Sequence, residues 1–194
     1  GNYDVSSVVS FAIDFAGTPI CAPVFMICMG AGWLFTRHSA PGDFFRRGLA
    51  LLGLGYGLNV ARLCIPLALI GDFPGGFSVL TPVNSFFAAD ILQFAGLAFL
   101  FMALIRKWHV SDALLLAITI LFSTLGGVWN GQWLTGVEPL ASLQGLFVYA
   151  GLTTAFPFFS WLAYPVAGYF FAKQLAACAQ RTRFYGVIGA WSLL

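Results

Sequence analysis

Long apolar stretches alternate with short polar segments along almost the whole chain. Five of them are long enough to cross a bilayer, and they cover residues 8–35, 45–70, 86–105, 110–128 and 158–177. A sixth begins near residue 184. A membrane-spanning helix takes about 20 mostly apolar residues. The pattern therefore predicts an all-α, polytopic integral membrane bundle of five complete transmembrane helices and a truncated sixth.

The segment 129–157 breaks this rhythm. It is moderately apolar, carries only Glu138 as a charge, and contains LASLQGLFVYAG at 140–151. We interpret it as an outer loop with a short re-entrant or interfacial helix, which needs cover from protein or from a water-filled cavity. Because the sequence starts at Gly1 and stops within an apolar run, we expect residues 1–194 to be a single transmembrane domain of a longer chain.

Composition supports the membrane prediction and narrows the set of partners. Hydrophobic residues make up 60% of the chain and charged residues 8%, whereas a soluble domain has about 25% charged residues. This excludes an ordinary soluble domain and a disordered chain. The net charge of +2 is too small to indicate a nucleic-acid partner. The expected partner is the lipid bilayer.

The basic residues lie almost entirely on one side of the predicted bundle. The opposite loops carry Asp4, Asp72 and Glu138. By the positive-inside rule the basic loops are cytoplasmic, and in a bacterial host the membrane would be the inner membrane. The chain has nine Lys and Arg, of which this side holds Arg37, Arg46, Arg47, Arg106, Lys107, Lys173, Arg181 and Arg183.

Three charged residues fall inside the predicted helices, where a charge costs about 2.5–3.5 kcal/mol near the centre. At about 1.5 Å per residue, Asp14, Arg62 and Asp90 lie about 9, 12 and 6 Å below the outer ends of the first three helices. Asn59 precedes Arg62 by three residues and Gln93 follows Asp90 by three, so each pair shares a helix face. We predict one polar pocket open to the outside. The alternatives are an Asp90–Arg62 ion pair that only ties helices together, and snorkelling of Asp90.

Other motifs add little chemistry. The cysteines Cys21, Cys28, Cys64 and Cys178 show no metal-ligand spacing, so we expect no metal site. Gly53 and Gly57 form a GxxxG on the second helix, a spacing typical of close helix packing. No nucleophile triad or phosphate-binding glycine loop is present, so the residues by themselves do not name a reaction.

Three stretches resemble one family. They are CAPVFMICMGAGWLF at 21–35 followed by FFRRGLALLGLG at 44–55, then ADILQFAGLAFLFMALIRK at 89–107, and FPFFSWLAYPVAGYFFAK at 156–173. In order and spacing they are similar to the transmembrane acyltransferases related to heparan-α-glucosaminide N-acetyltransferase. The ILQ turn that opens one helix and the FP…W…P start of a later one are the more specific parts.

The resemblance implies transfer of an acetyl group from cytoplasmic acetyl-CoA, or from another acyl-CoA, to an extracytoplasmic sugar. Acyl transfer needs a base near the acceptor and hydrogen-bond donors for the developing oxyanion. Because the five polar residues share a similar depth, we predict that Asp14 or Asp90 acts as the base, while Arg62, Asn59 or Gln93 binds substrate or stabilises developing charge.

The resemblance also implies a histidine on a helix that precedes the matched segment, and neither His38 nor His109 corresponds to it, so we expect a catalytic-domain fragment. The alternative is a non-catalytic accessory subunit of a larger membrane complex on the same scaffold. A transporter or channel is a third interpretation.

Overall fold

The structure is a computed structural model that describes residues 21–70, 85–128, 140–148 and 154–178. Every regular element in these ranges is helical, apart from an isolated bridge between Ala89 and Thr154. The all-α prediction is therefore confirmed for the described residues. The position of Asp14, the first part of the predicted first helix and the predicted sixth helix lie outside them.

The chain divides into two compact units, Gly1–Arg37 with Tyr164–Leu194, and His38–Ala163. In the first unit, α2 (Cys21–Phe35) packs against α10 (Ala163–Ala177). A Cβ on Gly30 would overlap the backbone of Pro165, and a Cβ on Gly168 would overlap the backbone of Ile27. Glycine at both positions lets the two helix backbones touch.

The second unit contains a long helix in three parts, α3 (Pro41–Asn59), η2 (Val60–Cys64) and α4 (Ile65–Ile70). Pro41 starts it well, because the first helical position needs no backbone N–H. Residues Pro41–Leu69 form a 29-residue helix that contains an 18-residue window with mean hydropathy 1.5. Among the described helices it alone is long and apolar enough to cross a membrane. A helix long enough to cross a membrane is therefore present where the span at 45–70 was predicted.

The other predicted spans have shorter counterparts. α2 and α7 (Asp112–Val128) are apolar but have only 15 and 17 residues. The predicted fifth helix, at 158–177, is divided at Leu162 into α9 (Phe158–Trp161) and α10. Pro165 favours this break because its nitrogen has no hydrogen to donate to Trp161 four residues earlier. The polytopic arrangement stays a prediction.

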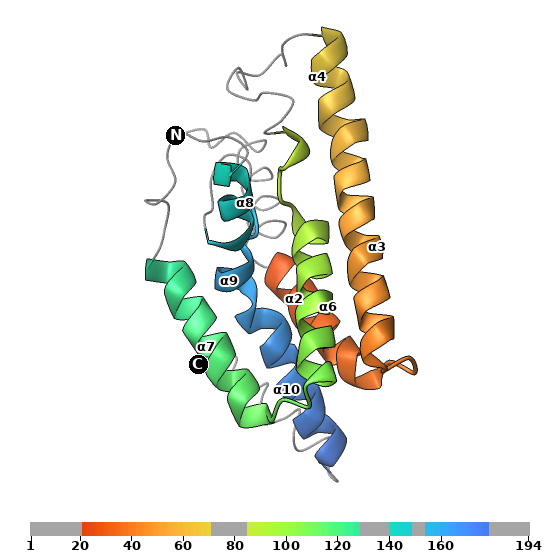
Figure 1. The fold of residues 1–194 in the computed structure, drawn as a ribbon. Helices are drawn as coiled ribbons and strands as arrows, with labels where there is room; N and C mark the ends of the chain where they lie inside the picture. The colour runs from red at the N-terminus through yellow and green to blue at the C-terminus, as the bar shows by residue number, and fades with distance from the viewer. Residues whose placement is uncertain (1–20, 71–84, 129–139, 149–153, 179–194) are drawn as a thin grey trace, which may run out of the picture. The chain divides into compact units, whose positions relative to one another are not determined.

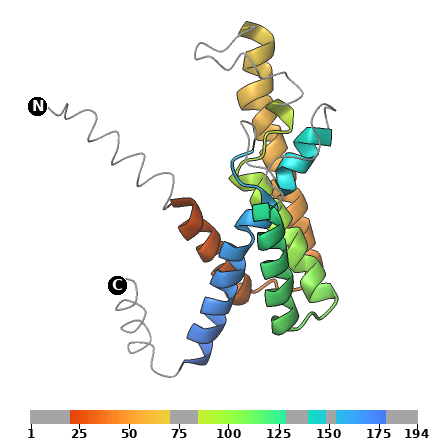
Figure 2. The same ribbon diagram turned by 90° about the vertical axis from the view of Figure 1, so that its left-hand side faces the viewer.

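Helix α6 (Ile91–Lys107) lies antiparallel beside α3, as Figures 1 and 2 show from two directions. Small residues allow this close packing. A Cβ on Gly48 would come within 2.9 Å of the Gly96 carbonyl oxygen and 2.8 Å of the Leu100 side chain. Gly53 and Gly57 face away, and a Cβ on either would meet no described atom within 4 Å. The glycines that bring α3 and α6 together are therefore not the pair that the GxxxG spacing suggested.

Aromatic side chains join the remaining helices of this unit. The Phe122 ring of α7 lies 4.5 Å from that of Phe159, and the Phe147 ring of α8 (Leu140–Phe147) lies 6.3 Å from that of Phe158. The helix predicted within 140–151 is thus present as α8. Its position relative to a membrane stays a prediction.

Candidate functional site

The site begins at the N-terminus of α6, where Asp90 caps the helix. Its Oδ1 accepts a hydrogen bond from the Ile91 backbone N–H at 2.8 Å, and Gln93 Oε1 accepts one from the Asp90 backbone N–H at 3.1 Å. This reciprocal capping box satisfies backbone donors that the first helical turn leaves without partners. Asp90 therefore lies at the end of a helix. We predicted that the third helix begins near residue 86 and contains Asp90. This start is wrong, because the cap holds Asp90 in an extended conformation and the helix begins at Ile91.

Opposite this cap, the long helix contains the π-helical turn η2. Asn59 stands immediately before the turn, is 1% exposed, and donates from Nδ2 to the carbonyl oxygens of Phe86 at 3.0 Å and Ala88 at 2.6 Å. Single π-helical turns are rare and occur frequently at functional sites. Asn59 thus ties the segment before α6 to the long helix, at the point where that helix changes its winding.

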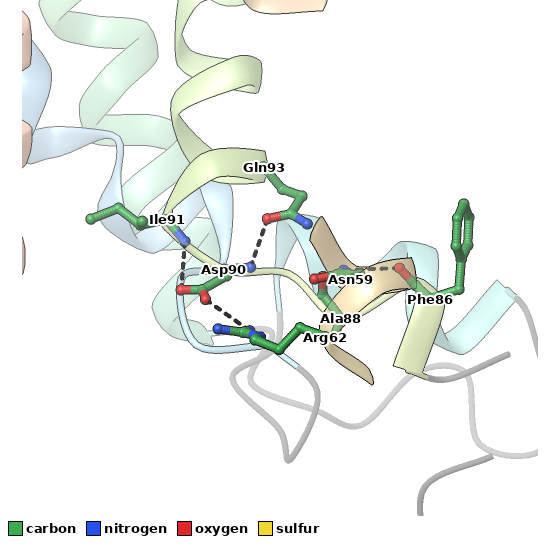
Figure 3. Close-up of polar contacts among 7 residues, drawn as sticks. All are labelled: Asn59, Arg62, Phe86, Ala88, Asp90, Ile91 and Gln93. Carbon is green, nitrogen blue, oxygen red and sulfur yellow. Dashed lines mark hydrogen bonds and ion pairs between the residues drawn. The ribbon is translucent and has the colours of Figure 1, made fainter. Parts of the chain in front are cut away.

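Arg62, within the π-helical turn, pairs with the cap residue. Its Nη2 lies 3.3 Å from Asp90 Oδ2, and the two side chains are 53% and 41% exposed (Figure 3). The Asp90–Arg62 ion pair foreseen from the sequence is therefore present. At this exposure in water such a pair contributes only about 0–1 kcal/mol, so stability alone is a weak reason for placing two charges here.

The structure thus gathers four of the predicted site residues, Asn59, Arg62, Asp90 and Gln93, in one polar cluster (Figure 3). We call these four residues the polar cluster. The predicted fifth member, Asp14, lies outside the described residues. The roles assigned to all of them stay predictions.

Gln93 is as deeply buried as Asn59, with 1% of the residue exposed. Its Oε1 is occupied by the Asp90 backbone N–H, which fixes the orientation of the amide. Nε2 is buried and has no hydrogen-bond partner in the described part of the chain. A buried donor without a partner costs about 1–3 kcal/mol.

Two buried hydroxyl residues near the cluster were missed by the sequence reasoning. Ser85 and Thr154 are 1% and 2% exposed. Thr154 forms the isolated bridge to Ala89, beside the hydrogen bond from the Ala155 N–H to the Ala89 carbonyl at 2.9 Å. Neither residue belongs to a motif, so only the folded chain shows that both are buried and that Thr154 lies beside the segment that leads into α6.

The polar cluster can donate hydrogen bonds to a substrate, whereas its one carboxylate, Asp90, already accepts hydrogen bonds within the protein. Both Asp90 oxygens are engaged, one by the helix N-terminus and the other by Arg62. Each carboxylate oxygen can accept a second hydrogen bond, so a substrate hydroxyl or amine would bind Asp90 Oδ2 beside the Arg62 guanidinium. The remaining Arg62 donors and Gln93 Nε2 are groups that can bind a substrate oxygen or stabilise an oxyanion.

The other end of the α3–α6 pair is basic. Arg106 donates from Nη1 to the Ser39 carbonyl at 2.7 Å and lies 4.1 Å above the Phe44 ring. Because α3 starts where α6 ends, exposed basic side chains of both helices occupy one end of the unit, and they are Arg46, Arg47 and Lys107. Exposed guanidinium and ammonium groups are the side chains that bind phosphate groups in proteins.

Residues 1–191 match the family model described as Heparan-alpha-glucosaminide N-acetyltransferase, catalytic. No curated protein and no solved structure matches the chain significantly. Because the match covers almost the whole sequence, the chain belongs to the heparan-alpha-glucosaminide N-acetyltransferase catalytic-domain family.

Proposed function

We propose that this chain is the acetyl-transferring domain of a membrane acetyltransferase. It moves the acetyl group of acetyl-CoA, or the acyl group of another acyl-CoA, to a sugar acceptor. Family membership supports acetyl transfer in a membrane. The observation that carries the proposal is the Arg62–Asp90 pair beside the buried amide of Gln93, at the π-helical turn of an apolar helix.

The two ends of the α3–α6 pair have different roles in this proposal. The basic end faces the cytoplasm and holds the phosphates of the donor, and the polar cluster faces the extracytoplasmic acceptor. Arg62 follows Arg46 by sixteen positions, or about 24 Å of helix at about 1.5 Å per residue. The donor phosphates and the acceptor would therefore occupy opposite ends of the same helix pair. In a bacterium the membrane would be the inner membrane.

The reaction assigns a role to each member of the polar cluster. The acceptor nitrogen or oxygen attacks the acetyl carbonyl carbon, the carbon–sulfur bond breaks, and the thiolate leaves with the electron pair. The proton lost by the acceptor goes to a base, for which Asp14 and Asp90 are the candidates, and then to the thiolate. Asn59 and Gln93 bind substrate, and Arg62 stabilises the negative charge that develops on oxygen.

The test is acetyl transfer by the full-length protein in proteoliposomes, with radiolabelled acetyl-CoA and a glucosamine-terminated acceptor. Asp90→Asn keeps a good N-cap but removes the charge, and Arg62→Gln removes the cation. We expect each variant to lose at least about ten-fold in transfer, with an unchanged thermal midpoint. Asp112→Asn, the same change at the start of α7, is the matched control and should transfer at the wild-type rate.

The outcomes separate the site from the function. Wild-type rates in both cluster variants would show that the polar cluster does not carry the reaction. A folded wild-type protein that transfers no acyl group would overturn the enzyme proposal, and the accessory-subunit interpretation would then take its place.

A further inference from the structure

We propose that Gln93 Nε2 donates a hydrogen bond to the carbonyl oxygen of the donor's acetyl group. The inference rests on the proposed function and names the atom that recognises the transferred group. Gln93 then has two tasks, since Oε1 completes the cap of α6 while Nε2 is reserved for substrate.

The orientation of the amide carries the first step. Oε1 accepts from the Asp90 backbone N–H at 3.1 Å, and only an oxygen can accept there. The other end of the amide must therefore be the NH₂ group. It is buried without a partner among the described residues, although buried polar groups in proteins are nearly always hydrogen-bonded. A substrate acceptor atom would supply the missing partner.

The Gln93 amide can lie close to α3 because Gly55 has no side chain. A Cβ on Gly55 would come within 2.9 Å of Gln93 Cδ and 3.1 Å of Nε2. Any larger residue at this position would push the amide away from the long helix. Gly55 and the capping box together hold the NH₂ group in place.

Burial favours an acetyl carbonyl over a sugar hydroxyl as the partner. A sugar brings several hydroxyl groups, each of which needs its own partner when it leaves water. An acetyl thioester brings a methyl group and one acceptor oxygen, which a single buried donor satisfies. The half-exposed Arg62 and Asp90 are better placed for a polyhydroxylated acceptor.

The same bond would assist the reaction. When the acceptor adds to the carbonyl carbon, the electron pair of the C=O bond moves onto the oxygen, and the hydrogen bond from Nε2 strengthens. When the carbonyl re-forms, the carbon–sulfur bond breaks and the thiolate leaves with its electron pair. Loss of one such donor typically lowers kcat about 100-fold or more.

The first experiment compares binding of acetyl-CoA and coenzyme A to the purified full-length protein by isothermal titration calorimetry, without acceptor. One hydrogen bond should make wild-type binding of acetyl-CoA about three- to ten-fold tighter than that of coenzyme A. Gln93→Glu keeps an oxygen for the capping box and loses the donor. We expect equal affinities for the two ligands in this variant, with unchanged affinity for coenzyme A.

Two control substitutions make the comparison specific. Gln144→Glu makes the same chemical change on α8 and should keep the wild-type preference for acetyl-CoA. Gly55→Ala leaves Gln93 unchanged but displaces its amide, so it should also abolish the preference. Gly57→Ala, two residues away on the same helix, meets no described atom within 4 Å and should keep it.

Each result decides the question. A preference for acetyl-CoA that survives both Gln93→Glu and Gly55→Ala overturns this inference but leaves the proposed function standing. A folded wild-type protein that binds neither ligand overturns both. If Gln93→Glu does not fold, Gly55→Ala against Gly57→Ala decides alone.

Discussion

Single residues in this chain affect its stability through the backbone. A side chain either gives backbone groups a hydrogen-bond partner or stands where the backbone conformation is strained. Asn59 uses its amide to hold two carbonyl oxygens of the segment before α6. His109 follows α6 with φ of 48°, the left-handed region that glycine normally occupies. There the Val110 N–H donates to the Ile105 carbonyl at 3.0 Å and the His109 N–H to the Arg106 carbonyl at 3.2 Å. This is a Schellman helix end, in which histidine carries a conformational cost.

His109→Gly should stabilise the protein. Glycine adopts the left-handed conformation without the steric cost that a side chain incurs, and we expect a gain of about 0.5–1 kcal/mol. The measurement is the thermal midpoint in detergent, with His38→Gly as the control because His38 does not have positive φ. A midpoint that falls in His109→Gly would mean that the imidazole makes a stabilising contact.

Asn59→Leu should destabilise the protein at nearly constant side-chain size. It leaves the carbonyl oxygens of Phe86 and Ala88 without this donor, and the expected loss is about 2 kcal/mol. The same thermal measurement checks it, against Leu58→Ala on the exposed face of α3. Equal midpoints for the two variants would show that water or lipid replaces the lost bonds.

At the scale of elements, close contact between helices depends on glycines, which have no side chain to hold two backbones apart. The α3–α6 pair closes over Gly48 and Gly96, and the α2–α10 pair closes over Gly30 and Gly168. At the end of α3–α6 with the polar cluster, the capping box and the π-helical turn face each other. The relative placement of Arg62 and Asp90 is therefore a property of two helix ends held together by packing.

Gly48→Ala should force α3 and α6 apart, because its Cβ would meet the Gly96 carbonyl oxygen, which cannot move as a flexible side chain can. We expect a loss of about 1–3 kcal/mol, measured as a lower thermal midpoint. Gly53→Ala on the open face of the same helix should keep or raise the midpoint, since alanine is a better helix former than glycine by about 1 kcal/mol. A similar response from both variants would contradict this packing.

At the scale of the whole molecule, the predicted orientation in the membrane depends on one apolar helix that carries different polar groups at its two ends. Exposed basic residues surround its start, and the polar cluster lies toward its end. Its 29 residues would extend about 44 Å at about 1.5 Å each, longer than the apolar core of a bilayer of about 30 Å. Both ends should therefore reach water on opposite sides.

Cysteine labelling tests this orientation. In a background without Cys21, Cys28, Cys64 and Cys178, single cysteines are placed as Ser39→Cys and Leu69→Cys, both at exposed positions. In sealed right-side-out vesicles an impermeant maleimide should label only the Leu69→Cys protein, and permeabilisation should add Ser39→Cys. Labelling of both from outside would contradict a membrane-crossing α3–α4 helix.

The sequence by itself determined the helical class, the long apolar helix at 45–70, and the residues that would meet beside it. Apolar run length and a three-residue spacing are local properties, so Asn59 with Arg62 and Asp90 with Gln93 could be recognised without a structure. The functional roles of these residues stay predictions, but the four residues of the polar cluster do lie together.

Tertiary structure alone decided how these residues meet. The π-helical turn depends on backbone hydrogen bonds within the folded helix, which apolar periodicity does not encode. The contact between Arg62 and Asp90 depends on how two helix ends that are distant in the sequence pack together. The burial of Ser85 and Thr154 depends on contacts between distant segments. The Gln93 NH₂ group, which has no partner among the described residues, can lie against α3 because Gly55 has no side chain, and this juxtaposition of two distant residues belongs to the folded chain.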